Sequence, residues 1–202
     1  MFIQIMQGQV KNATGVRKTM DRWLQDLEPG AVGWVGGTFG ISDDGMFMAV
    51  VRFESAEAAQ SNSHRPEQSV WWKEMEQYFT GPVSFHDCKD VMLLAGGGSD
   101  KAKFVQVIQG RVRDRERVHT LTEQSASMLS KYRPDVIGST IAIDDGGFFT
   151  ETVSFTSETE ARAAESRLMP PEVQKMMEEE MSLIEGVTYI DLHEPWFATH
   201  AS

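Results

Sequence analysis

Residues 104–112 read FVQVIQGRV, and residues 2–10 read FIQIMQGQV, so the chain contains nearly the same segment twice at an offset of 102 residues. The offset continues without a gap well beyond this segment. Further pairs are Val35 with Ile137, Phe47 with Phe149, Val51 with Val153 and Phe53 with Phe155. A period of about 100 residues is too long for a solenoid or a propeller blade. The sequence therefore predicts duplication of a whole small domain.

Each copy has the pattern of strand, helix, strand, strand, helix and strand. Alternating apolar residues predict the strands, helical spacing predicts the helices, and Asp-Asp-Gly at 43–45 predicts a hairpin that the second copy repeats at 144–146. The second helical region is interrupted at Pro66. In the first copy the predicted strands are 2–10, 31–41, 46–54 and 82–92, and the predicted helical regions are 14–28 and 55–80. This order is the ferredoxin-like βαββαβ unit.

The third strand of each copy explains why two copies are needed. Phe47 and Val51 lie on the strand face that the helices would cover, and Met48 and Val50 lie on the opposite face. A single unit has no further layer to cover this second apolar face. Stacking two such sheets would bury both apolar faces. We therefore predict an α+β protein of two tandem ferredoxin-like units that form a pseudo-dimeric α+β barrel with face-to-face antiparallel sheets.

A glycine-rich segment separates the copies. Residues 94–103, LAGGGSDKAK, are small and polar, which is typical of a flexible linker. The predicted domains are therefore 1–93 and 104–202, joined by the linker 94–103.

Composition and charge exclude several classes of partner. The formal net charge is −11, with 8 basic and 13 acidic side chains in residues 1–100 and 11 and 17 in residues 101–202. Nucleic acid and anionic membranes are therefore not expected as partners, because their phosphates attract cations. The N-terminal MFIQIMQGQVK lacks the features of a signal peptide, and no apolar run reaches the ~18 residues of a membrane span. A cytoplasmic location is expected.

The sequence does not predict a metal site. Cys88 is the only cysteine, which excludes an internal disulfide, and it is expected to be a small buried group. His86 and Cys88 alternate onto one strand face, but no third ligand is evident. Walker, dinucleotide-binding and nucleophile-elbow motifs are absent from the sequence.

One stretch carries a family resemblance. Residues 52–72, RFESAEAAQSNSHRPEQSVWW, run from a strand into a helix that breaks between Asn62 and Pro66 and resumes with two tryptophans, and SFTSETEARAAE at 154–165 repeats its first part. With the fused units, this resembles the antibiotic-biosynthesis-monooxygenase-like (ABM-like) branch of the dimeric α+β barrel superfamily. The resemblance implies a pocket between sheet and helices in each unit. Its members are cofactor-free oxygenases of polyketide-like aromatics, haem degraders, small-molecule isomerases and proteins of no known activity.

The resemblance implies an asparagine, a tryptophan and a histidine or tyrosine around the pocket. In the first copy we expect Asn62 or His64 to polarise an oxygen or move a proton, and Trp71 and Trp72 to stack on the ligand. Alternatives stay open at two of these positions. Trp71 also fits a core stripe, since it shares helical spacing with Met75, and His64 also fits a helix cap.

Three further ligand-binding candidates accompany them. Arg65, next to a helix start at Pro66, could contact an anion or a carboxylate, and Trp23 adds a further aromatic group. At the offset of 102 residues, Trp23 becomes Ser125, whose small side chain would open space under the first helix of the second copy.

Glu151 is the unusual residue of the second copy. It replaces Ala49 on the strand face that carries Phe149, so its carboxylate would be desolvated, with a raised pKa, unless it is paired or faces a cavity. We therefore predict a pocket in which Glu151 binds a polar group or transfers a proton. The alternatives are that strand twist or a bulge takes Glu151 to the edge, or that an arginine such as Arg162 pairs with it.

The sequence thus predicts a protein that binds a small apolar or aromatic molecule without a cofactor. The alternatives are a cofactor-independent monooxygenase or isomerase acting on a small aromatic or polyketide-like substrate, and a haem-binding or haem-degrading protein. Further homodimerisation of the fused pair stays open.

Overall fold

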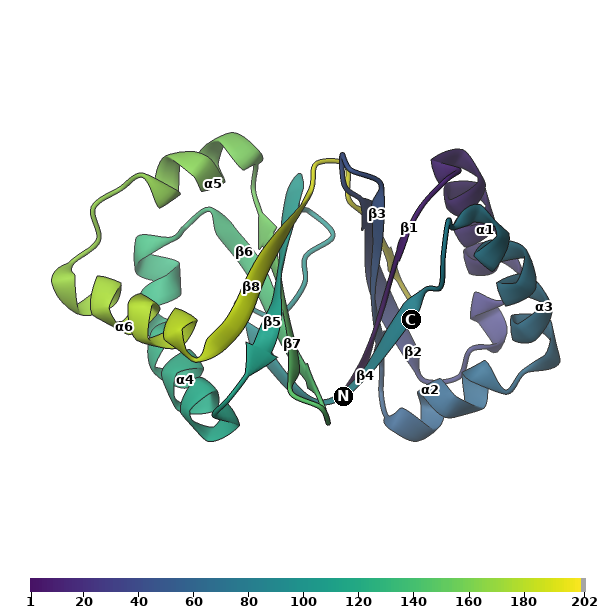
Figure 1. Ribbon diagram of the computed structural model, residues 1–202, viewed down its shortest axis with the longest axis horizontal. Helices are drawn as coiled ribbons and strands as arrows, with labels where there is room; N and C mark the ends of the chain where they lie inside the picture. The colour runs from purple at the N-terminus through teal and green to yellow at the C-terminus, as the bar shows by residue number, and fades with distance from the viewer. Residues whose placement is uncertain (201–202) are drawn as a thin grey trace. The chain divides into compact units, whose positions relative to one another are not determined.

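The computed structural model describes residues 1–200, except for the side chain of Ser130. Contacts divide the chain into two units (Figure 1): the first comprises Met1–Lys89 together with the segment from Trp196 onward, and the second comprises Asp90–Pro195. Each unit has the βαββαβ order, so the predicted α+β class and the tandem ferredoxin-like units are confirmed. The packing of one sheet on the other stays a prediction.

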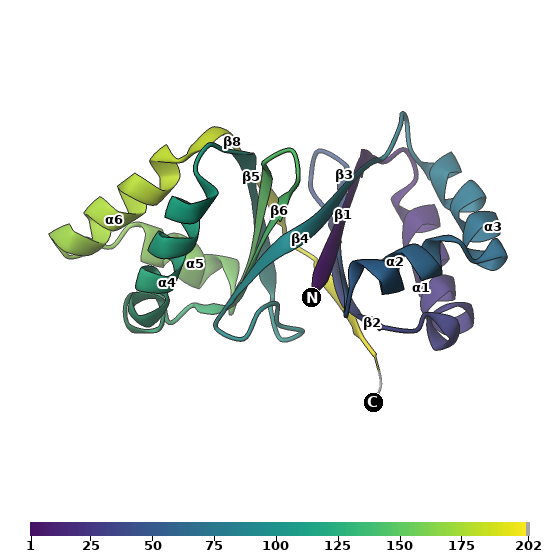
Figure 2. The ribbon, with the colours of Figure 1, turned by 90° about the horizontal axis from the view of Figure 1, so that it is seen from below.

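The first unit is an antiparallel sheet with its helices on one face (Figures 1 and 2). Its elements are β1 Phe2–Gln9, α1 Ala13–Asp26, β2 Trp34–Ile41, β3 Met46–Phe53, α2 Ala56–Ser63, α3 Pro66–Met75 and β4 Ser84–Leu94, with short 3-10 turns at Glu28–Gly30 and Glu76–Tyr78. The strands lie in the order β4-β1-β3-β2, and β1 pairs antiparallel with both β3 and β4.

The second unit repeats this arrangement. Its elements are β5 Phe104–Val112, α4 Arg115–Tyr132, β6 Val136–Asp144, β7 Phe148–Phe155, α5 Glu158–Glu165, α6 Pro171–Ser182 and β8 Ile184–Leu192. The strand order is β8-β5-β7-β6, and the end of β4 lies next to β6. In Figure 2 the helices α4, α5 and α6 lie together on one face of this sheet. Over residues 1–200, no helix is both long and apolar enough to cross a membrane.

A short last strand, β9 at Trp196–Thr199, was not predicted. It pairs antiparallel with β2, so the end of the chain completes the sheet of the first unit. Trp196 stacks on Phe39 with ring centroids 6.0 Å apart, and the guanidinium of Arg17 lies 4.5 Å from the Trp196 ring centroid. The boundary between the two units lies between residues 89 and 90, within β4. This strand continues to Leu94, past the predicted domain end at 93.

The helices of the first unit bury an apolar stripe against the sheet. In α1, Val16, Met20 and Trp23 are buried, and the side chain of Asn12 caps the helix by accepting a hydrogen bond from the Gly15 N–H at 2.9 Å. These residues join one continuous core cluster with the inward faces of β1, β2 and β3. In the second unit the described residues include separate clusters, one around Phe149 and Ile141 and one around Phe104 and Phe155.

The second helical region is broken at an X-Pro bond in both units. Arg65 has ψ 132° and precedes Pro66, and Pro170 has ψ 143° and precedes Pro171. The helical region is sterically disfavoured for a residue before proline, whereas proline itself suits the first helical position. The chain must therefore leave one helix and begin another over the sheet.

The segment 94–103, predicted as a flexible linker, packs closely against the second unit. A methyl group placed on Gly138 in β6 would lie 1.8 Å from the Gly97 carbonyl oxygen. The backbone N–H of Ser99 donates a hydrogen bond to the Ser154 hydroxyl at 3.4 Å, and Ala102 is buried. The absence of a side chain at position 138 is what permits this approach.

We predict that Gly138→Ala destabilises the protein by more than about 2 kcal/mol, because backbone atoms of the segment 94–103 would have to move. Urea unfolding followed by circular dichroism measures the loss. Gly81→Ala is the control, since no atom lies within 4 Å of the added methyl group. A Gly138→Ala variant as stable as Gly81→Ala would contradict the close packing.

Candidate functional site

The first unit contains a cavity of about 480 Å³ between the sheet and all three helices. Its walls come from β1, β2, β3 and β4 on one side and from α1, α2 and α3 on the other. The aromatic lining residues are Trp23, Trp34, Phe39, Phe53, Trp71, Trp72 and Phe85. The polar lining residues are Gln4, Asn62, Ser63, Gln68, Ser69, Lys73 and Glu76.

The tryptophans form a connected aromatic wall. The Trp23 ring packs edge to face with Trp34 at a centroid distance of 5.4 Å and with Trp71 at 6.4 Å. Trp71 is buried, and its Nε1 donates a hydrogen bond to the Thr19 carbonyl oxygen at 2.9 Å. Trp71 therefore belongs to the core, as one interpretation of the sequence held, and also lines the cavity.

Trp72 lies nearer to solvent than Trp71. It is partly buried and packs edge to face with Phe85 of β4 at a centroid distance of 5.1 Å. It lines the cavity.

The carboxamide of Asn62 is buried and held in a defined orientation. Its Oδ1 accepts a hydrogen bond from the Arg65 guanidinium at 3.0 Å, and the same guanidinium donates to the Leu27 carbonyl oxygen at 2.9 Å. Because Oδ1 is occupied by Arg65, the Nδ2 group is the part of the amide that can donate to a ligand. Arg65 thus ties Asn62 to the end of α1.

Two predicted residues lie outside the cavity lining. His64 is exposed at the C-terminal end of α2, where its backbone N–H donates to the Gln60 carbonyl oxygen at 3.1 Å. Arg65 contacts Asn62, Leu27 and Glu67. A direct ligand contact for either residue stays a prediction, and the structure brings only Asn62, Trp23, Trp71 and Trp72 to the first cavity.

The second unit contains a smaller cavity of about 190 Å³ in the equivalent place. Ser125 and Glu151, the two candidates of this copy, both line it. Apolar lining residues include Ile108, Val153, Phe155, Met128, Met169, Met176, Met177 and Met181. At the offset of 102 residues, Gln4, Val51 and Phe53 of the first cavity correspond to Gln106, Val153 and Phe155 of the second.

Glu151 lies in the middle of the sheet. It is paired with Ile108 of β5 and with Ile141 of β6, without a register shift at this position. The Ser139 hydroxyl donates a hydrogen bond to its carboxylate at 2.7 Å. Arg162 does not neutralise it, because that guanidinium pairs with Glu158, Glu165 and Asp191. Both alternatives, an edge position and pairing with Arg162, are therefore wrong.

Burial raises the pKa of the Glu151 carboxyl above its usual range, and the hydrogen bond from Ser139 opposes this only in part. Burial, and next the charge of Glu151, raise the pKa of the Glu180 carboxyl to about 7, against a hydrogen bond from Thr122. Two interacting acids of α6 and β7 thus lie at one apolar cavity.

Glu180 was not found from the sequence, because the offset of 102 residues pairs it with Tyr78. The helix starts give the correct register: Pro66 and Pro171 are both first residues of their helices, so Glu180 takes the place of Met75, which is fully buried. In the same register Trp71 corresponds to Met176 and Trp72 to Met177. Alignment of the two prolines would have shown an acid at a core position.

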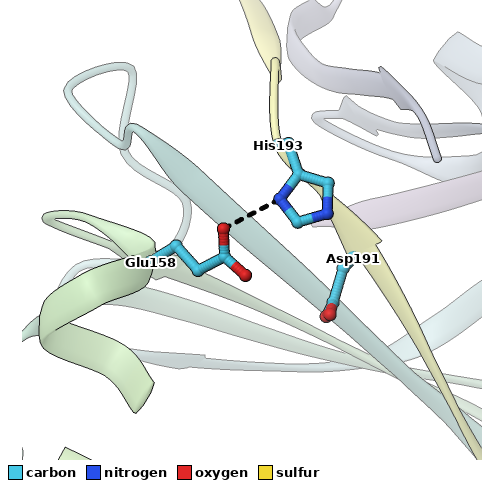
Figure 3. Close-up of side chains that lie close together, drawn as sticks. All are labelled: Glu158, Asp191 and His193. Carbon is cyan, nitrogen blue, oxygen red and sulfur yellow. Dashed lines mark hydrogen bonds and ion pairs between the residues drawn. The ribbon is translucent and has the colours of Figure 1, made fainter. Parts of the chain in front are cut away.

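A group of potential metal ligands lies elsewhere in the second unit. The side chains of Glu158, Asp191 and His193 approach within 4.8 Å of one another (Figure 3), and His193 Nδ1 lies 3.0 Å from a Glu158 carboxylate oxygen. Arg162 pairs with both carboxylates, and Gln106 donates to Asp191 at 2.8 Å. The guanidinium already supplies the positive charge that a metal ion would bring. The first unit repeats one of these contacts, since Gln4 donates to Asp87 at 2.8 Å.

Comparison with known proteins supports the fold. No family model and no curated relative matches this sequence. A "putative monooxygenase" from Lactobacillus acidophilus NCFM superposes with a TM-score of 0.73 at 12% identity, covering 99% of this chain and 96% of that one. Another from Fusobacterium nucleatum gives 0.73 at 10% identity, covering 100% and 95%.

An anthrone oxidase-like protein superposes with a TM-score of 0.62 at 8% identity, covering 100% of this chain and 96% of that one. The chain shares its fold with monooxygenase-like proteins. At these identities the likeness concerns the fold alone. The expected structural resemblance is confirmed over the whole chain.

We predict that Glu180→Gln stabilises the protein at high pH and much less at low pH. The folded-state pKa of Glu180 is raised to about 7 from 4.5, so the folded protein binds more protons than the unfolded chain between these values. Its stability therefore falls as the pH rises from 4.5 to about 7. The stability difference between variant and wild type should grow by roughly 2 to 3 kcal/mol between about pH 5 and pH 8.

Urea unfolding at both pH values measures this difference. Glu178→Gln is the matched control, because it removes the same charge from an exposed position of α6. A pH-independent difference for Glu180→Gln, equal to that of Glu178→Gln, would show that Glu180 is not desolvated.

Proposed function

We propose that the protein is an ABM-like small-molecule-binding protein whose first cavity holds a planar aromatic molecule bearing carbonyl or hydroxyl oxygens. The observation that supports this most is the combination of four tryptophans with oriented side-chain amides around one cavity. The cavity volume of about 480 Å³ also falls within the range of ~300 to 1,000 Å³ of small-molecule sites.

The polar groups of the cavity favour a ligand that accepts hydrogen bonds. Asn62 Oδ1 is occupied by Arg65, and Gln68 Oε1 accepts a hydrogen bond from Trp23 Nε1 at 2.7 Å. Both amides are therefore held with their NH₂ groups as the ends that remain for a ligand. Lys73 adds a further donor to the lining. Carbonyl and hydroxyl oxygens of an aromatic ligand would satisfy such donors, while its rings contact the indoles.

A second candidate function is a cofactor-independent oxygenase acting on the same kind of molecule. In such a reaction an anthrone-type substrate loses a proton and its anion reacts with O₂, so that one oxygen atom becomes the new carbonyl of the quinone and the other leaves as water. Asn62 Nδ2 would stabilise the developing negative charge on the substrate oxygen, and Glu76, also in the lining, would accept the proton. The fold shared with an anthrone oxidase-like protein suggests the substrate to test.

The haem alternative finds less support in this cavity. Haem iron is held by a histidine, cysteine, methionine or tyrosine side chain. The described lining of the first cavity offers no imidazole, thiol or phenol, and its methionines, Met6 and Met20, both belong to the core. The residues present do not fit a haem ligand set, and the chemistry of the cavity is derived without it.

We predict that Asn62→Asp weakens the binding of a hydroxyanthraquinone about tenfold or more. The substitution preserves the acceptor oxygen for Arg65 but replaces the Nδ2 donor with a second acceptor, which would repel the ligand oxygen. Quenching of tryptophan fluorescence measures the dissociation constant. Ser61→Ala, at an exposed neighbouring position of α2, is the control. Equal affinities for wild type and Asn62→Asp would contradict the proposed binding mode.

The oxygenase candidate has its own test. If the first cavity oxidises anthrone under O₂, the wild-type rate should exceed that of Asn62→Asp by about 100-fold, because a lost oxyanion donor costs roughly this factor. Oxygen consumption and the absorbance of the quinone product measure the rate. A wild-type rate no higher than that without protein, with binding intact, would leave a binding function and remove the oxygenase, whereas equal accelerated rates in both proteins would remove the role of Asn62.

A further inference from the structure

We propose that the cavity of the second unit is a separate site for a small organic cation, a protonated amine on an apolar body, with the carboxylates of Glu151 and Glu180 as its counter-charges. This site is independent of the ligand proposed for the first cavity. Its geometry rests on a cavity of about 190 Å³, a wall that carries Glu151, Glu165 and Glu180, and a lining rich in methionine.

The two units show what has changed at equivalent positions. Ala49 and Met75 of the first unit have no exposed surface, and Glu151 and Glu180 stand in their places. Trp23, which fills space in the first unit, is replaced by Ser125. Two core positions have therefore become acidic beside a position that has lost an indole ring. These three residues line one cavity.

The negative charge of this cavity is not neutralised within the described residues. The carboxylate of Glu151 is bound by the Ser139 hydroxyl, and that of Glu180 by the Thr122 hydroxyl at 3.4 Å. The one arginine in the lining, Arg133, is held by Asp135 through contacts of 2.8 to 3.2 Å. Hydroxyl donors leave the net charge unchanged, so an added cation would be attracted.

The other charged groups near α6 are engaged with partners of their own. Arg117 of α4 pairs with Glu179, and Glu165 of α5 pairs with Arg162. Arg113 pairs with Glu185 of β8. Glu165, already paired with Arg162, and Tyr132 also line the cavity. Glu151 and Glu180 are therefore the groups whose charge a ligand would meet.

The lining selects an organic cation over a hydrated metal ion. Met128, Met169, Met176, Met177 and Met181 present flexible, polarisable thioether chains, which adapt to apolar ligands. A hard metal ion would require six or more oxygen ligands, including carbonyls and waters, whereas this wall is mainly hydrocarbon and sulfur. An ammonium group needs few acceptors, and its hydrocarbon body can contact the methionines. The net charge of −11 also favours the approach of cations.

Binding should depend on pH through the two carboxyls. Burial raises the pKa of both carboxyls, that of Glu180 to about 7, so the negative charge that attracts the amine is lost as the pH falls. An alkylamine stays protonated up to about pH 9, as lysine does. The affinity should therefore increase at least tenfold between about pH 5.5 and pH 8.

The test compares three probes of similar shape and different charge: 2-phenylethylamine, 2-phenylethanol and phenylacetate. Isothermal titration calorimetry measures affinity, and NMR spectra of protein with ¹³C-labelled methionine methyl groups locate the probe. Met128, Met169, Met176, Met177 and Met181 line the second cavity, whereas Met6 and Met20 line the first, so the spectra distinguish the two sites. Each methionine methyl signal is assigned by its absence from the spectrum of the corresponding single Met→Leu variant.

Glu180→Gln and Glu151→Gln keep the shape of the side chain and remove its charge. Each should weaken amine binding at least tenfold at pH 8 and much less at pH 5.5, and neither should impair folding, because loss of a desolvated charge is not destabilising. Glu178→Gln, exposed on the same helix, is the charge-matched control and should bind as wild type does.

Each outcome decides the proposal. Amine binding that shifts the methionine signals of the second cavity, exceeds that of the alcohol and the carboxylate, and is lost in Glu180→Gln but not in Glu178→Gln supports it. Absence of amine binding, equal binding of alcohol and amine, or shifts confined to Met6 and Met20 overturn it. Asn62→Asp should leave amine binding unchanged, so failure of the first-cavity proposal is recognised separately.

Discussion

The break between the two short helices of each unit is the constraint on which the cavities depend. The helical region is disfavoured for a residue that precedes proline. Arg65 and Pro170 are accordingly extended, and the chain crosses the sheet as two short helices. Two short helices cover the sheet incompletely, and side chains of α1 or α4 must meet them from the other side. In both units the cavity is lined by residues from this broken region and from the sheet beneath it.

Duplication has given one scaffold two different interiors. The register set by the helix starts matches Trp71 with Met176, Trp72 with Met177 and Met75 with Glu180. The order of the elements is the same in both units, so the contrast in chemistry comes mainly from the side chains. Rigid indoles with oriented amides suit a flat ligand that accepts hydrogen bonds, whereas flexible thioethers with acids suit a small ligand that donates them.

The fold could be predicted from the sequence because the repeated strand pattern is strong and regular. β9 could not, since four residues have little propensity of their own and its partner β2 lies far away in sequence. Glu151 was found because it interrupts an apolar strand face. Glu180 was missed because five residues, 166–170, separate α5 from α6, whereas two residues separate α2 from α3. Those three extra residues shift the register, and the sequence shows them only through the two prolines.

The acids of the second unit also have an energetic consequence. A desolvated carboxylate without a cation is unfavourable in the folded state, and two that interact are more so. A methionine and an alanine at these positions, as in the first unit, would remove the penalty, so Glu151 and Glu180 contribute nothing to folding that apolar residues could not provide. Residues that are unfavourable in a protein core are expected where a functional site requires them. A cation that binds only the folded protein would restore the lost stability through mass action. The same two carboxylates thus lower the stability of the folded protein and attract the cation that would restore it.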